Sequence, residues 1–161
     1  MIGSVMKLHP FVVHMPIALL LVGGLTGLAS GRKAELVTVS WWTWFIGTLA
    51  SIGSSISGLV GHQPYEGTHL SGHIEQHLVL GVSTSIGAII IALARRHSRR
   101  KGDDFIRRGV PYRLLPLSVA LLCVVTGWSG GRLVYDHGIG VALPAECGPV
   151  PTPKLSHRQA P

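Results

Sequence analysis

The chain of 161 residues has a mass of 17.1 kDa, a size typical of a single domain. Charged residues make up 13% of it, against roughly 25% in soluble domains, while apolar residues make up 47% and the mean hydropathy is +0.41. This composition excludes a disordered chain and argues against a water-soluble globule. The net charge of +7 by itself would suggest a nucleic-acid partner. Because the basic residues are clustered between long uncharged runs, we expect no nucleic acid.

Four apolar runs are each close to the ~20 residues that an α-helix needs to cross a bilayer. They cover residues 11–29, 37–60, 78–94 and 114–131. The runs are too long for strands and lack the period-two alternation of a half-buried strand. We therefore predict an all-α, integral membrane four-helix bundle over residues 1–141. A Pro-rich tail, extended or disordered, is predicted over residues 142–161.

Basic residues predict how this bundle is oriented. Ten of the fourteen Lys and Arg residues lie in two loops, one after the first run and one between the third and fourth runs. Loops rich in Lys and Arg remain on the cytoplasmic side of the membrane. We therefore predict that both termini and the connection between the second and third runs lie outside. The basic loops also fit attraction to anionic lipid.

The second run carries two further patterns. The aromatic residues at its start are predicted to form an interfacial belt: Trp41, Trp42, Trp44 and Phe45. Small residues then follow at steps of four and three and keep to one face: Gly47, Ser51, Ser54 and Gly58. Such a face lets helix backbones approach closely in lipid, or it leaves room for a flat cofactor.

Histidines are the most unusual feature, because nine of them outnumber the seven acidic residues. The predicted topology places eight on the outer side, at the ends of all four runs and in the tail: His9, His14, His62, His69, His73, His77, His137 and His157. Only His97 falls in a basic loop. Neutral imidazole binds haem iron, copper or zinc. The pattern therefore predicts a bound haem or metal near the outer face.

The depth of each histidine suggests which ones act as ligands. His14, His77 and His137 are expected at matched depth, as two axial ligands of one haem would need, and the same three would serve a bare metal. His9 or His73 would complete a second pair nearer the surface.

Spacing and charge add three expectations. His9 and His14 are five residues apart, about 140° around a helix, so they need not serve one centre. His69, His73 and His77 would share one face if their stretch is helical. Arg132 would hold an anionic group, such as a haem propionate or a lipid phosphate.

Motifs for hydrolytic chemistry are missing. The stretch from His73 to His77 is not a zinc-protease motif, because Gln76 precedes the second histidine. The sequence has no nucleophile elbow, no phosphate-binding loop and no C-x-x-C pair. We interpret the chain as an electron carrier or a subunit rather than a stand-alone enzyme.

Three segments carry a resemblance: His9-Pro-Phe-Val-Val-His14-Met-Pro-Ile-Ala-Leu, Gly61-His62 with the histidines that follow, and Gly130-Gly-Arg-Leu-Val-Tyr-Asp-His137-Gly-Ile-Gly-Val. Together they resemble a bacterial four-helix membrane family known as domain of unknown function 2231. Some members are fused to Rieske iron–sulfur or cytochrome c domains, which implies membrane electron transfer and a role like that of a haem b protein. On matching positions, the resemblance points to His9, His14, His77 and His137.

Residues and resemblance together predict a membrane electron-transfer protein or subunit with haem b, in the bacterial inner (cytoplasmic) membrane. Its partners would be the lipid bilayer, a periplasmic redox protein or a quinol, and helices of other subunits. Two alternatives stay open: a membrane protein that binds copper or zinc through the same histidines, and a structural subunit without a cofactor.

Overall fold

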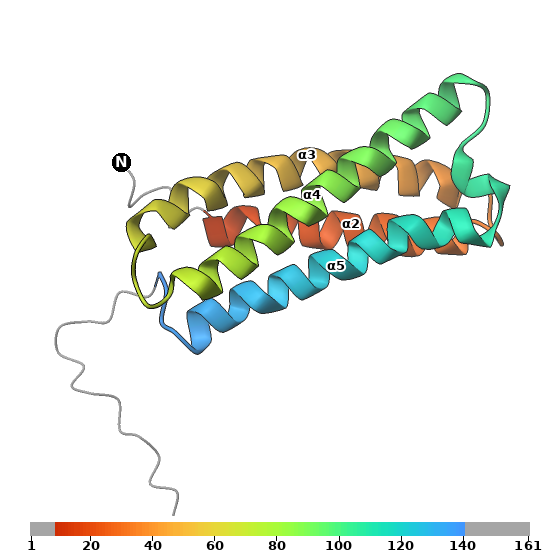
Figure 1. Cartoon of the computed structure of the whole chain (residues 1–161). Helices are drawn as coiled ribbons and strands as arrows, with labels where there is room; N and C mark the ends of the chain where they lie inside the picture. Colours follow the sequence, from red (N-terminus) through yellow and green to blue (C-terminus); the bar gives the residue numbers. More distant parts are fainter. Residues whose placement is uncertain (1–8, 141–161) are drawn as a thin grey trace, which may run out of the picture.

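The computed structural model describes residues 9–140, and these residues form a bundle of helices (Figure 1). Four helices in this part of the chain are long and apolar enough to cross a membrane: His9–Ala29, Leu36–His62, Ser71–Arg100 and Val110–Tyr135. The regular part of the first is α2 (His14–Ala29), and the others are α3 (Leu36–His62), α4 (Ser71–Arg100) and α5 (Val110–Tyr135). The predicted all-α membrane bundle is confirmed. The predicted tail lies outside the described residues.

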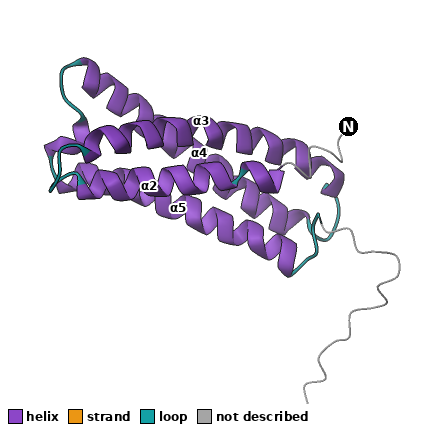
Figure 2. Cartoon of the chain, turned by 180° about the vertical axis from the view of Figure 1, so that it is seen from behind, coloured by secondary structure: helices purple, strands orange, loops and turns teal. Residues whose placement is uncertain are grey.

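The helices form a closed ring in chain order. Helix α2 packs against α3 and α5, and α4 packs against the same two from the other side (Figures 1 and 2). The 3-10 helix η1 (Gln63–Tyr65) lies between α3 and α4, and η2 (Phe105–Arg108) lies between α4 and α5. We call the end with His9, His62 and His77 the histidine end, and the end with Arg95 and η2 the arginine end.

The third spanning helix is much longer than its apolar run. Helix α4 begins at Ser71 and ends at Arg100, whereas the run predicted residues 78–94. The added turns are polar at both ends, and polar residues tolerate a helical backbone wherever they reach the aqueous interface. Hydropathy therefore located the membrane-crossing part of α4 and missed its ends.

The tightly packed core lies toward the arginine end. Trp44 is completely buried there and donates a hydrogen bond from Nε1 to the carbonyl oxygen of Ala88, 3.2 Å away. A Cβ added to Gly23 on α2 would stand 3.1 Å from the backbone nitrogen of Trp44, and one on Gly47 would stand 3.1 Å from the backbone nitrogen of Leu20. Glycines thus bring α2 and α3 into backbone contact, as small residues do between membrane helices.

The predicted aromatic belt is wrong for two of its members. Trp44 belongs to the core, and Trp41 is only 8% exposed, whereas Trp42 is 55% exposed. Trp41 lies beneath two guanidinium groups, with its ring centroid 5.7 Å from Cζ of Arg95 and 5.1 Å from Cζ of Arg99. These cation–π contacts, together with the helix packing, turn one side of the aromatic cluster inward.

A buried ion pair closes the arginine end. Arg95 is fully buried, although its place after an apolar run suggested a loop residue, and its Nη2 lies 2.8 Å from Oδ2 of Asp104. Arg95 Nη1 also donates to the hydroxyl of Ser40 at 2.9 Å, and that hydroxyl donates to the carbonyl of Gly23 at 2.7 Å. This network connects α2, α3, α4 and the turn before η2. It holds the helices together at the arginine end, whereas they lie further apart at the histidine end.

Candidate functional site

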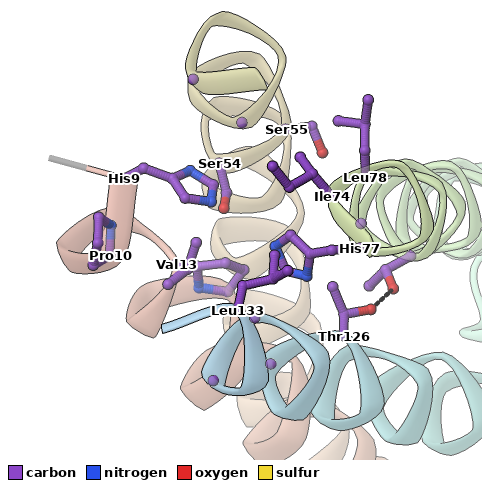
Figure 3. Close-up of a pocket in the computed structure, with 18 of the residues that line it drawn as sticks. His9, Pro10, Val13, Ser54, Ser55, Ile74, His77, Leu78, Thr126 and Leu133 are labelled. Carbon is purple, nitrogen blue, oxygen red and sulfur yellow. Dashed lines mark hydrogen bonds between the residues drawn. The ribbon is translucent and has the colours of Figure 1, made fainter. Parts of the chain in front are cut away.

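The histidine end encloses a cavity of ≈ 480 Å³ that is lined from all four spanning helices (Figure 3). This volume lies within the roughly 300–1,000 Å³ of small-molecule and cofactor sites. Most of the lining surface is apolar, with contributions from Ile74, Leu78 and Leu133. The lining also contains four histidines: His9, His14, His62 and His77. A cavity of this kind suits a largely apolar ligand that is anchored by imidazole.

The small-residue face of α3 explains why the bundle opens here. Gly47 is buried in the packed half. Ser51 is buried too but already reaches the cavity, and Ser54 and Gly58, further along the same face, line it. The two interpretations of this face therefore apply to different halves of it. The inner half forms a helix seam, and the outer half leaves space.

Hydroxyl groups at the inner end of the cavity bond to one another. Oγ1 of Thr84 lies 3.1 Å from Oγ1 of Thr126, the dashed contact in Figure 3, and Oγ of Ser55 lies 2.8 Å from Oγ of Ser85. Because these hydroxyls already have partners, they add little demand for further hydrogen bonds. The imidazoles are then the groups of the cavity best suited to bind a metal ion.

His9 points into the cavity from the start of the first spanning helix (Figure 3). Its Nδ1 lies 2.7 Å from the hydroxyl oxygen of Ser57 on α3. In the tautomer that donates from Nδ1, the lone pair of Nε2 is free to bind a metal, as in metal sites where the second ring nitrogen is held by a neighbour. The ring also rests on Gly58, where an added Cβ would stand 3.3 Å from its Cε1.

His77 enters the cavity from α4 and lies against α5. A Cβ added to Gly130 would stand 2.9 Å from Cε1 of His77, so the ring occupies space that any larger residue would fill. Its Nδ1 is buried and has no hydrogen-bond partner among the described residues. A buried polar atom without a partner is costly, and a bound ligand is one way to satisfy it.

The rings of His9 and His77 face each other across the cavity. Their centroids are 6.4 Å apart and their planes are at 83°. Two imidazoles on opposite sides of one metal ion, each at a metal–nitrogen distance of about 2 Å, would have centroids about 6 Å apart. The observed separation therefore fits two axial ligands of one iron.

His14 and His62 complete the histidine lining. Nδ1 of His14 lies 2.6 Å from the carbonyl oxygen of Pro10, one turn earlier. Nδ1 of His62 lies 3.5 Å from Oε1 of Glu66, and its Nε2 is buried without a partner among the described residues. The five-residue spacing of His9 and His14 left open whether the two serve one centre, and both line the same cavity.

His73, His137 and Arg132 lie elsewhere, in a smaller groove of ≈ 150 Å³ between α4 and α5. The rings of His73 and His137 stack with centroids 4.6 Å apart and planes at 25°. Nε of Arg132 pairs with Oδ2 of Asp136 at 2.9 Å. Arg132 thus has a local partner and lies outside the lining of the main cavity.

The expected shared face of His69, His73 and His77 is not formed. Helix α4 begins at Ser71, so His69 lies in the preceding turn and is exposed. His73 and His77 are both helical, but one faces the groove and the other the cavity. Among residues 9–140, no group of three or more His, Cys, Asp or Glu side chains is arranged to hold a metal ion.

A family model described as "Predicted membrane protein (DUF2231)" matches residues 6–143. The chain belongs to this family. The match confirms the resemblance seen in the three histidine-bearing segments and the multi-pass membrane character of the chain. Searches of curated proteins and of solved structures find no match to it. The arrangement of the histidines therefore carries the functional argument.

Some residues of the site were not among the predicted site residues. His62 and Gly130 line the cavity and Ser57 contacts His9, and none of the three was selected. The sequence does point to the region around Gly130, because Gly127 and Gly131 on either side of it mark a stretch of small residues in α5. Nothing in the sequence shows which of these glycines meets an imidazole.

Proposed function

We propose that this protein is a membrane electron-transfer protein or subunit that holds a b-type haem in the cavity at the histidine end. The observation that carries the proposal is the His9–His77 pair, with ring centroids 6.4 Å apart inside a mostly apolar cavity of ≈ 480 Å³. The unpartnered Nδ1 of His77 and the glycines beneath both rings agree with it.

The residues in and around the cavity have different roles in this proposal. His9 and His77 would hold the haem iron, and Ser57 would keep the His9 ring in place through Nδ1. Ile74, Leu78 and Leu133 exclude water and lower the local polarity, which together with the ligands sets the redox potential. The bound haem supplies one-electron transfer. An electron carrier needs no further catalytic residue.

The proposed surroundings follow from the predicted orientation. With the basic loops in the cytoplasm, the histidine end faces outward in a bacterial inner membrane. A periplasmic redox protein or a quinol would then exchange electrons with the site.

Copper or zinc in the same cavity is the second candidate. The four lining histidines and the buried, unpartnered nitrogens of His62 and His77 favour it. A bare zinc ion takes three or four protein ligands, and no such group is assembled among residues 9–140. A haem needs only two ligands, so the observed pair supports haem over a bare metal.

The decisive experiment is the absorption spectrum of the detergent-purified protein, produced with an ample haem supply, together with metal analysis of the same sample. A Soret band with low-spin features is expected. His9→Ala and His77→Ala should each lose the haem or turn it high-spin, while His97→Ala at the arginine end should leave the spectrum unchanged. Stoichiometric copper or zinc without a Soret band would establish the second candidate. A sample with neither would refute both.

A further inference from the structure

The groove between α4 and α5 contains a pair of histidine rings whose centroids are closer together than those of His9 and His77. His73 lies in the first turn of α4, and His137 follows the end of α5. Their rings stack at a centroid separation of 4.6 Å, against 6.4 Å for His9 and His77. The two pairs are separate, because His73 and His137 line the groove and not the main cavity.

We infer that His73 and His137 form a second site, which binds Cu²⁺ at the outer rim of the bundle. Two imidazoles that bind one ion at neighbouring positions, each at a metal–nitrogen distance of about 2 Å, have ring centroids about 4.5–5 Å apart. The stacked pair already has this separation. This inference does not depend on haem binding.

The tilt of the rings must change before nitrogens of both can reach one ion. The rings are now at 25°, whereas in-plane bonds to a common ion require them to turn toward each other. Rotation about the Cβ–Cγ bond of histidine has a broad energy profile, so this turn is cheap. His73 is exposed and has room to rotate.

The backbone around His137 is fixed before any metal binds. Gly138, with φ of +66°, reverses the chain directly after it. Two backbone hydrogen bonds close this turn, from the nitrogen of Gly138 to Val134 O at 3.0 Å and from the nitrogen of Ile139 to Leu133 O at 3.0 Å. One ligand is therefore held in a rigid turn beside a helical one, which lowers the entropy lost on binding.

The electrostatics of the groove permit a cation. Arg132 carries the permanent positive charge of the groove. The carboxylate of Asp136, with Oδ2 2.9 Å from Nε of Arg132, neutralises this charge. The Arg132 guanidinium also lies over the Trp128 ring, 5.4 Å from its centroid. The amide of Gln76 and the hydroxyl of Ser129 line the same groove and supply oxygen atoms beside the imidazoles. Imidazole with oxygen ligands and water suits Cu²⁺.

The test is titration of the detergent-purified full chain, carrying no histidine tag, with Cu²⁺ alone, followed by calorimetry and electron paramagnetic resonance. His73→Ala and His137→Ala should each weaken the tightest site by about a hundredfold, because the advantage of two tethered ligands is lost. Each variant should also remove the hyperfine signature of a second imidazole nitrogen. His69→Ala, an exposed histidine four residues before His73, is the matched control and should bind as the original chain does.

Other outcomes overturn the inference. If His77→Ala rather than His73→Ala removes the tightest Cu²⁺ site, the ion binds in the main cavity. If His73→Ala and His137→Ala bind Cu²⁺ as the original chain does, the stacked rings do not form a metal site. The Soret absorbance of the same samples is an independent readout, and His73→Ala should leave it unchanged. A haem-free preparation that still loses Cu²⁺ in His73→Ala would refute the haem proposal and support this one.

Discussion

The imidazole of His77 on α4 lies directly against Gly130 on α5. A Cβ at position 130 would stand 2.9 Å from Cε1 of His77, closer than side-chain carbons normally approach. The next residue, Gly131, has nothing within 4 Å of the same position. The two neighbouring glycines thus differ in one respect, which is whether a histidine ring needs the space.

This difference predicts opposite outcomes for two similar substitutions. Gly130→Ala should push the His77 ring out of its position and lower the haem content of the purified protein, because axial ligation depends on where that ring lies. Gly131→Ala should lower the haem content less, because its methyl group would enter the cavity but meet no atom of the protein within 4 Å. Both changes exchange Gly for Ala in α5 and favour the helix by the same ~1 kcal/mol. Equal haem content in the two variants, measured by the Soret absorbance per protein, would contradict a role for His77 as a ligand.

A second prediction separates the two possible partners of His77. The depth argument from the sequence pairs it with His14, whereas the ring separation of 6.4 Å pairs it with His9. We expect His9→Ala to lose haem or convert it to a high-spin form, and His14→Ala to keep a low-spin spectrum. Ser57→Ala should give an intermediate loss, because it frees the His9 ring without removing it. Loss of haem in His14→Ala with retention in His9→Ala would restore the sequence-based pair.

The number of spanning helices and the end that carries the histidines could be predicted from the sequence. Apolar runs of about 20 residues locate bilayer-crossing helices reliably, because lipid requires backbone hydrogen bonds within each segment. The histidines were assigned to one side by the loops in which they lie. Both inferences depend on local sequence, and the structure agrees with each.

The pairing of the histidines could not be predicted in the same way. Which ring faces which depends on helix rotation, and membrane helices show little periodicity in hydrophobicity because lipid and core are both apolar. His73 and His77 are one turn apart and still enter different spaces. Arg95 gave no sign of burial either, because its partner Asp104 approaches only after the chain turns back at η2.

Topology is tested by a third prediction. In a Cys147→Ser background, Thr68→Cys in the loop after α3 should react with a membrane-impermeant maleimide added from the outer side of the membrane. Lys101→Cys at the end of α4 should react only after the membrane is opened. Both positions are exposed, and the remaining Cys123 is buried, so it contributes no background. The reverse labelling pattern would invert the orientation and place the histidine end in the cytoplasm.

The last prediction concerns the buried ion pair at the arginine end. Replacing one partner, as in Arg95→Met or Asp104→Leu, should lower the free energy of unfolding by about 3–5 kcal/mol, because it leaves the other charge buried without its partner. The double variant Arg95→Met/Asp104→Leu should recover much of this loss, since apolar side chains of similar size need no partner. Arg107→Ala removes the partly exposed pair with Asp103, whose charged atoms are 3.9 Å apart, and should change stability by less than about 1 kcal/mol. Denaturant unfolding in detergent measures all four variants. If Arg95→Met is no more destabilised than Arg107→Ala, the network does not hold the arginine end together, and the helices must be fixed by the Trp44 core alone.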